Sequence, residues 1–165
     1  MSKVTTNVVG GIIVKGDKIL IAQRSDRADH PLKWEFPGGK VLSNENINQA
    51  LMREFKEELG IEIKKSFFLM DYIHEYKYLK KIHLHFFKID DYLGKIFNHV
   101  HSKIIWINEI DIKNFDPKSH CSPKKSLLVT AAKVFPGGEL IKLNSYTGFD
   151  QRAVIVGAHK KHPIE

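Results

Sequence analysis

The chain has 165 residues, of which 42% are hydrophobic and 10% aromatic, which is enough for one domain with a buried core and too little for a second full domain. It contains no apolar run of about 18 residues or more, and residues 1–9 lack the hydrophobic block of a signal peptide, so we expect a cytoplasmic protein that does not enter a membrane. The single cysteine, Cys121, excludes an internal disulfide and a cysteine-rich zinc site. The net charge of +7 favours a polyanionic partner, either a nucleoside triphosphate or nucleic acid.

The first part of the chain predicts a hairpin and a short strand. Residues 7–14 and 18–24 are rich in β-branched and apolar side chains, and the Lys-Gly-Asp sequence at 15–17 between them is typical of a tight turn. A polar loop then leads to a short strand at 34–36. Pro37-Gly38-Gly39 follows and predicts a sharp turn of the backbone.

A helix is predicted over residues 47–59 from the residues at its two ends. Asn46 can cap the first turn, and Gln49 stands at the reciprocal position of a capping box. Gly60 is placed to end the helix.

This helix is expected to carry two different faces, because residues three and four apart lie together at about 100° per residue. The apolar arc consists of Leu51, Met52, Phe55 and Leu59, and the acidic arc consists of Glu54, Glu57 and Glu58. Like charges at these spacings repel, and a hard divalent cation such as Mg²⁺ would offset that repulsion through oxygen ligands. The alternative is a solvated acidic face with Arg53 and Lys56 as partners.

The second half of the chain predicts further strands and one more helix. Residues 67–78 and 81–89 form a second hairpin pattern, and 103–107 a later strand. Ser122-Pro123 supplies a cap for a helix over 124–135, and two added strands are expected at 139–143 and 153–156. Strands interspersed with two helices favour an α/β or α+β sandwich with a mixed sheet and helices on both faces.

Residues 39–61 resemble the Nudix box. That pattern is a glycine, five residues, a glutamate, seven residues, and then Arg-Glu-apolar-any-Glu-Glu-any-Gly-apolar. All nine specified positions are filled, by Gly39, Glu45, Arg53, Glu54, Phe55, Glu57, Glu58, Gly60 and Ile61. The preceding residues, 34–40, read WEFPGGK and are similar to the entry of the box in MutT-like members of the family.

The resemblance implies a fold, a reaction and a metal site. It implies an α/β/α sandwich over residues 1–135. Residues 136–165 lie beyond the resemblance, and from their own pattern we expect a C-terminal extension that forms a β-hairpin on the same domain. In such enzymes water attacks an inner phosphorus of a nucleoside triphosphate and releases a monophosphate and pyrophosphate. The implied metal ligands for Mg²⁺, or Mn²⁺ as its substitute, are Glu54, Glu57, Glu58 and a carbonyl of Gly38 or Gly39. Arg53 would orient a glutamate, and Glu45 would brace the loop.

The resemblance also implies residues that bind the substrate. These are Arg24, Phe36, Lys80 or Lys81, and, in the loop before the last helix, Ser119 or Cys121. Phe36 is equally well explained as core, and Arg24 as the exposed end of a strand. Strand alternation places His83 and His85 on one face and Leu84 on the other.

One position departs from the family pattern. MutT-like chains carry a glutamate six residues before the tryptophan of the late strand, and counting back from Trp106 gives Val100. Asn98, His99 and His101 are its neighbours, and either histidine is a chemically suitable general base. The alternative is that both are surface loop histidines.

These observations leave several functions open. The first is a Mg²⁺-dependent hydrolase that removes oxidised dGTP (8-oxo-dGTP) from the nucleotide pool. The alternatives are an enzyme for modified pyrimidine triphosphates, one that trims RNA 5′ ends, and a non-catalytic Nudix-like sensor of nucleotide or RNA. The expected partner is a nucleoside triphosphate, with nucleic acid less favoured and no membrane. The protein would be a monomer or a homodimer.

Overall fold

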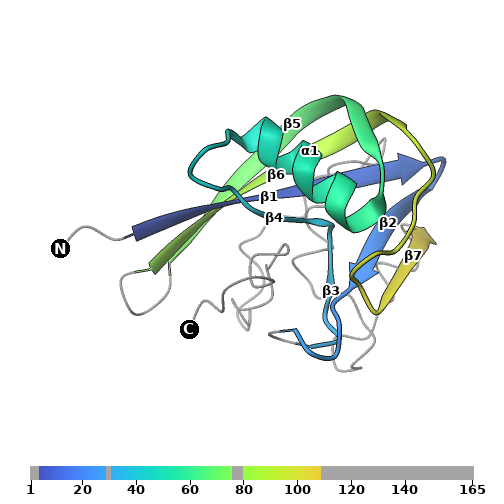
Figure 1. The fold of residues 1–165 in the computed structure, drawn as a ribbon, viewed down its shortest axis with the longest axis horizontal. Helices are drawn as coiled ribbons and strands as arrows, with labels where there is room; N and C mark the ends of the chain where they lie inside the picture. The colour runs from blue at the N-terminus through green and yellow to red at the C-terminus, as the bar shows by residue number, and fades with distance from the viewer. Residues whose placement is uncertain (1–3, 29–30, 76–79, 109–165) are drawn as a thin grey trace.

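The structure is a computed structural model that describes residues 4–28, 31–75 and 80–108 (Figure 1). The elements are β1 (Val4–Lys15), β2 (Lys18–Gln23), β3 (Trp34–Glu35), β4 (Gly38–Lys40), α1 (Ile47–Leu59), β5 (Glu62–Glu75), β6 (Lys80–Leu93) and β7 (Lys103–Asn108). The helix predicted over 124–135 and the extension predicted over 136–165, with its strands at 139–143 and 153–156, lie outside the described residues. Of the described residues, α1 is the only helix, and it is neither long nor apolar enough to span a membrane.

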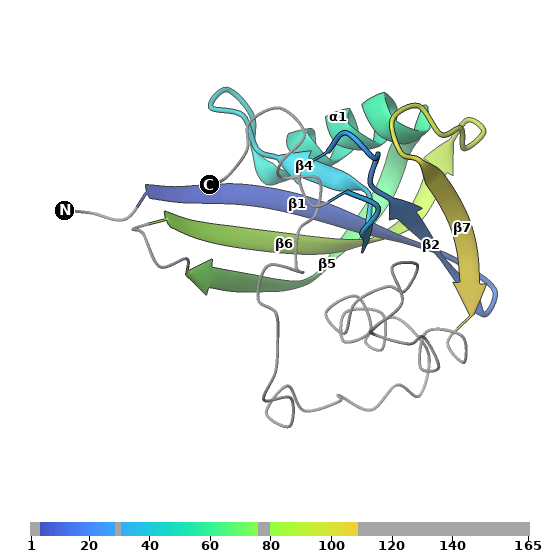
Figure 2. The same ribbon diagram turned by 90° about the horizontal axis from the view of Figure 1, so that it is seen from below.

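The strands form one mixed sheet. Their order is β3-β2-β1-β6-β5, with β4 also pairing with β1 and β7 with β2. Strands β1 and β6 run parallel in register from Val4 and Lys80 to Ile13 and Ile89, whereas the remaining pairs are antiparallel. Helix α1 lies on one face of this sheet, where it contacts β1, β4 and β5 (Figure 2). The predicted α/β class with a mixed sheet is therefore confirmed.

Both predicted hairpins form, with strand bounds that differ from the predicted ones. The first turns at residues 16–17, where Lys15 pairs with Lys18. Its first strand begins at Val4 instead of residue 7. In the second hairpin, β5 begins at Glu62 instead of residue 67, directly after the helix, because Ile61 and Ile63 are buried and draw the chain into the sheet.

The ends of α1 are the predicted ones. The Asn46 side chain accepts hydrogen bonds from the backbone N–H groups of Asn48 and Gln49, and the Gln49 side chain accepts one from the backbone N–H of Asn46. Gly60 ends the helix in the left-handed conformation, with φ of 69°, which a side chain would strain. Local capping chemistry therefore sets the length of α1.

Two apolar clusters lie on opposite faces of the sheet. The cluster under α1 consists of Val9, Ile13, Leu20, Ala50, Leu51, Phe55, Leu59, Ile61, Ile63, Phe87 and Ile89. The cluster on the other face consists of Val8, Ile12, Ile19, Ile21, Trp34, Phe36, Ile82, Leu84, Phe86 and Ile107. Leu51, Phe55 and Leu59 are buried as predicted, but the prediction for Met52 is wrong, because Met52 is 44% exposed. Met52 follows Leu51 by about 100° and so stands at the edge of the apolar arc.

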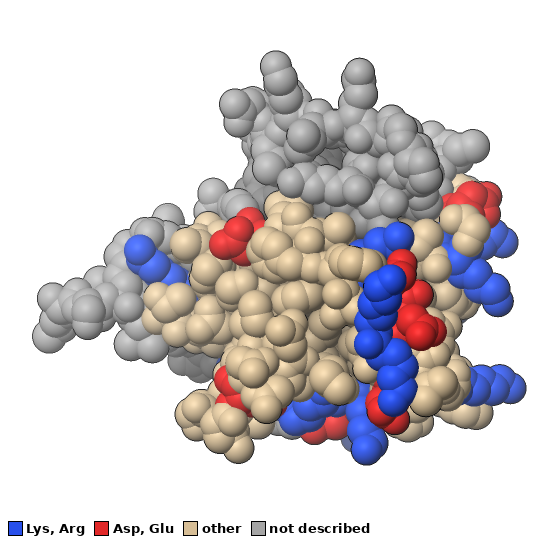
Figure 3. Space-filling view, turned by 90° about the horizontal axis from the view of Figure 1, so that it is seen from above, with Lys and Arg blue, Asp and Glu red and all other residues tan. Residues whose placement is uncertain are grey.

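The surface combines mixed charge with exposed apolar side chains. On the face in Figure 3, lysine and arginine side chains gather in a band that runs beside acidic side chains. Opposite charges also lie together on β5 and β6, where Lys65 and Lys88 both approach Asp90, at 3.4 and 3.6 Å. Phe67 and Phe68 on β5 are about half exposed, at 47% and 54%.

Replacing Asn46 with alanine should lower the free energy of unfolding by about 1 kcal/mol, because two N–H groups at the start of α1 lose their side-chain acceptor. Urea denaturation measures the change. The control is Asn48→Ala, because Asn48 enters the cap through its backbone N–H and should change stability by about 0.5 kcal/mol or less. Equal midpoints for the two variants would show that the cap contributes nothing.

Candidate active site

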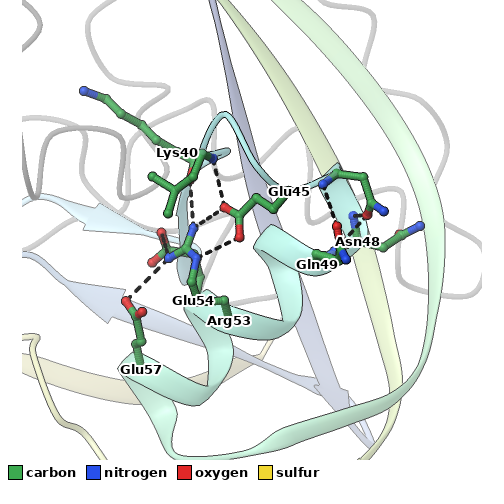
Figure 4. Close-up of polar contacts among 9 residues, drawn as sticks. Lys40, Glu45, Asn48, Gln49, Arg53, Glu54 and Glu57 are labelled. Carbon is green, nitrogen blue, oxygen red and sulfur yellow. Dashed lines mark hydrogen bonds and ion pairs between the residues drawn. The ribbon is translucent and has the colours of Figure 1, made fainter.

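Arg53, in the middle of α1, binds three glutamates and a backbone carbonyl (Figure 4). Its Nε and Nη2 donate to the two carboxylate oxygens of Glu45, at 2.9 and 2.6 Å, and Nη2 also donates to the carbonyl of Lys40 at 3.0 Å. Its Nη1 donates to Glu54 at 2.8 Å and to Glu57 at 3.5 Å. The hydrogen bonds that Arg53 donates to Glu45 are the largest contribution that raises the pKa of Arg53 above its ordinary value. The guanidinium therefore stays charged and fixes three carboxylates relative to one another.

Glu45 links this guanidinium to the loop before the helix. Its Oε1 accepts a hydrogen bond from the backbone N–H of Leu42 at 2.9 Å while it also binds Arg53. A two-pronged ion pair of this kind defines orientation as well as distance. The loop between β4 and α1 is thereby tied to the middle of the helix.

The three box glutamates differ in their exposure. Glu54 and Glu58 are buried, at 6% and 1% exposure, whereas the Glu57 side chain is 45% exposed. Glu54 and Glu58 follow Leu51 by three and seven residues, which places them beside the apolar arc of the helix. A solvated acidic face is therefore the wrong description of Glu54 and Glu58, and only Glu57 fits it.

The two buried carboxylates lie against the Gly38–Gly39 backbone of β4. Gly38 donates its N–H to Glu58 Oε2 at 3.0 Å. A Cβ added to Gly39 would stand 2.2 Å from Glu54 Oε1, so only glycine allows this carboxylate to approach the strand so closely. The antiparallel pairing of β4 with β1, from Val8–Lys40 to Gly10–Gly38, holds both glycines in place.

A second buried polar group lies behind Glu58. Arg24 Nη1 donates to Glu35 Oε2 at 2.9 Å, and both side chains are nearly inaccessible. His101 Nε2 lies 3.6 Å from Glu35 Oε1 and 3.6 Å from Glu58 Oε2. Sequence reasoning missed Glu35, although a carboxylate between Trp34 and Phe36 in a predicted strand was a signal that it is buried with a partner.

The predicted substrate residues have different surroundings. Arg24 is buried at 3% exposure, so its interpretation as an exposed strand end is wrong. Phe36 lies in the core, 2% exposed, with its ring edge-on to Phe86 at 6.3 Å. Lys80 begins β6 and pairs with Val4, but its side chain is not described. Ser119 lies outside the described residues, as do its alternative Cys121 and the rest of that loop.

His83 and His85 share one face of β6, with Leu84 buried on the other, as predicted. They lie on the same side of β6 as Phe87, which faces α1, whereas Phe36 lies on the opposite side of the sheet. His83 Nε2 lies 2.6 Å from Asp71 Oδ2, and this hydrogen bond lowers the pKa of Asp71. Burial lowers the pKa of His85. The two histidines and Phe36 therefore do not line one pocket.

The loop at the position of the family glutamate contains one exposed and one buried histidine. Val100 is 43% exposed, and His99 is also exposed, which confirms the surface interpretation for His99. That interpretation is wrong for His101, whose side chain is 1% exposed.

The donor set suits a hard divalent cation, because carboxylates from neighbouring turns of α1 meet the glycine backbone of β4 and supply oxygen ligands. In the arrangement described, Arg53 holds Glu54 and Glu57 while Gly38 holds Glu58. Across residues 4–28, 31–75 and 80–108, no three His, Cys, Asp or Glu side chains stand together in a geometry that holds a metal ion. Binding would therefore require a shift of side chains, for which the exposed Glu57 has room.

Comparison with known proteins gives concordant matches. The NUDIX domain family matches residues 4–128. CTP pyrophosphohydrolase of Escherichia coli K12 is 37% identical over 120 residues, which cover 73% of this chain and 78% of that protein. The 8-oxo-dGTP diphosphatase of Buchnera aphidicola subsp. Schizaphis graminum is 40% identical over 118 residues, covering 70% and 88%.

Solved structures agree with the sequence matches. The solution structure of the E. coli ORF135 protein superposes with a TM-score of 0.59 at 36% identity, covering 66% of this chain and 78% of that one. The crystal structure of the MutT NUDIX hydrolase from Burkholderia pseudomallei also has a TM-score of 0.59, at 25% identity, covering 65% and 85%. The box, the fold around it and these relatives together show that this chain belongs to the Nudix family of hydrolases, in its MutT-like branch.

Proposed function

We propose that this Nudix hydrolase uses Mg²⁺, or Mn²⁺ in its place, to cleave a nucleoside triphosphate to a monophosphate and pyrophosphate, with 8-oxo-dGTP as its principal substrate. The observation that carries the proposal is the set of carboxylates held around Arg53 and against Gly38–Gly39. The choice of base follows relatives that bear the name 8-oxo-dGTP diphosphatase at 32–40% identity. Because the substrates would be free nucleotides, we also expect the protein to work in the cytoplasm.

In this proposal Glu54, Glu57 and Glu58 hold the cation beside the backbone of Gly38 and Gly39. When bound, the cation would neutralise phosphate charge and lower the pKa of a bound water. Arg53 and Glu45 are the residues that keep the carboxylates aligned, since one guanidinium binds both Glu45 and Glu54. Exclusion of solvent from Glu54 and Glu58 strengthens their interaction with positive charge.

The substrate residues complete the proposal. Phe36 would flank the base, and Arg24, Lys80 and Ser119 would contact phosphate or base. Arg24 is paired with Glu35, so it would have to contact a phosphate while it keeps that ion pair. Residues 1–135 would form the catalytic domain and 136–165 its extension.

A second candidate substrate is a pyrimidine triphosphate. It is favoured by the E. coli relative named CTP pyrophosphohydrolase, at 37% identity. Trimming of RNA 5′ ends is less favoured, because the relatives compared above are named for reactions on CTP or 8-oxo-dGTP.

Incubation with Mg²⁺ and a panel of 8-oxo-dGTP, dGTP, CTP, 5-substituted dCTP and triphosphorylated RNA tests the substrate. We expect the highest kcat/KM for 8-oxo-dGTP, with pyrophosphate as the product detected by chromatography. A preference for a pyrimidine would support the second candidate. Release of orthophosphate would contradict the proposed cleavage site, and tight binding without turnover would identify a sensor.

Glu57→Gln should lower kcat about 100-fold or more, because it removes one anionic oxygen from the proposed cation site. Steady-state kinetics at saturating Mg²⁺ measures the loss. Glu62→Gln is the matched control, since Glu62 is an exposed glutamate just beyond the helix and pairs only with Lys64 among the ion pairs described. A near-normal kcat for Glu57→Gln would contradict the metal assignment.

Gly39→Ala should reduce kcat about 10-fold or more, because the new Cβ would displace the Glu54 carboxylate from a position 2.2 Å away. Gly16→Ala is its control: φ is +62° there and nothing lies within 4 Å, so the cost falls on stability alone. Kinetics and thermal unfolding of both variants separate the two effects. Unchanged kinetics for Gly39→Ala would show that Glu54 does not need its place beside β4.

A further inference from the structure

His101 is a buried histidine between two buried carboxylates. Its side chain is 1% exposed, and Nε2 lies 3.6 Å from an oxygen of Glu35 and 3.6 Å from an oxygen of Glu58. Within the part of the chain that the structure describes, neither ring nitrogen of His101 makes a hydrogen bond. A buried polar group without a hydrogen bond lowers the stability of the folded protein, so packing alone does not explain a histidine at this position.

The loop between β6 and β7 is built to turn His101 inward. The Asn98 side chain donates to the carbonyl of His101 at 2.7 Å and accepts from its N–H at 2.9 Å, which closes a tight turn. The turn leaves Val100 exposed and His101 buried. Two local hydrogen bonds from one side chain therefore set which residue of the loop faces the site.

Backbone hydrogen bonds fasten the same loop to the end of α1 and to β2. Phe97 and His99 donate their N–H groups to the carbonyls of Leu59 and Glu58, at 2.9 and 3.0 Å, and Ser102 donates to Gln23 at 2.9 Å. The loop thus satisfies carbonyls in the last turn of the helix that carries Glu58. The positions of His101 and Glu58 are coupled through the backbone as well as through their side chains.

One carboxylate oxygen of Glu58 accepts a hydrogen bond from β4 and lies near the ring of His101. Oε2 accepts the N–H of Gly38 at 3.0 Å and lies 3.6 Å from His101 Nε2. An imidazole N–H that approaches by a few tenths of an ångström would donate to this oxygen. That hydrogen bond would fix the direction in which the Glu58 carboxylate points.

We propose that His101 is a positioning residue, which orients Glu58 for the divalent cation through an Nε2–H hydrogen bond shared with Glu35. The proposal rests on the function proposed above. His101 acts through Glu58 and does not itself touch the substrate. Glu35, held by Arg24, would anchor the far side of the ring.

Three substitutions separate orientation from packing. His101→Gln can place an amide N–H near the position of Nε2, His101→Asn is too short to do so, and His101→Phe fills the space without a donor. Mn²⁺ binding followed by electron paramagnetic resonance gives the Kd without any turnover, and steady-state kinetics gives kcat and KM. His99→Gln is the control, since that exposed histidine lies in the same loop.

We expect His101→Phe and His101→Asn to raise the Mn²⁺ Kd about 10-fold and to lower kcat similarly, with KM for the nucleotide unchanged. His101→Gln should restore both values to within about 3-fold of the original protein. If His101→Phe does not fold, His101→Asn decides the question. An unchanged Kd for His101→Asn, or a His101→Gln as impaired as His101→Asn, would overturn the proposal.

Failure of the proposed function would look different. If the original protein hydrolyses no nucleotide of the panel, the function is wrong, yet the Mn²⁺ titrations still measure what His101 does to Glu58.

Discussion

The structure of the site depends on one guanidinium. Arg53 binds Glu45, Glu54 and Glu57 together with the carbonyl of Lys40, and so joins the middle of α1 to the loop that precedes it. Carboxylates this close repel one another, and burying a carboxylate without a neighbouring cation carries a large desolvation penalty. Arg53 offsets both effects for the buried Glu54, while the Glu57 side chain remains 45% exposed.

The sheet supplies the other half of the site. Strand β4 presents two glycines to α1, and its pairing with β1 sets their height relative to the helix. The apolar side of α1 packs on β1 and β5, so the carboxylates beside that apolar arc lie against the β4 backbone. The geometry of the site therefore depends on core packing. Substitution of core residues under α1 would move the carboxylates of the site.

The reaction and the base are specified by different parts of the chain. The box and the glycines that support it lie in residues 38–61. Relatives that match this part of the chain are named both as a CTP pyrophosphohydrolase and as 8-oxo-dGTP diphosphatases. A site that holds cation and triphosphate tolerates different bases, because phosphate chemistry is common to all of them. Selectivity must come from side chains that contact the base edge, and the candidates from the late loop lie beyond residue 108.

By itself, the sequence determined what depends on neighbours along the chain. Asn46, Gln49 and Gly60 defined both ends of α1, and the turn at 15–17 defined the first hairpin, because caps and turns involve residues within about four positions. The box identified the family because all nine of its positions lie at fixed spacings within residues 39–61. Only the tertiary structure decided that Glu54 and Glu58 are buried while Met52 is exposed, that Glu35 pairs with Arg24, and that His101 and not His99 faces Glu58. Those outcomes depend on contacts between β3, β4, α1 and the β6–β7 loop. These segments are distant in the sequence, and the segment that packs against a helix or loop decides which of its sides becomes buried.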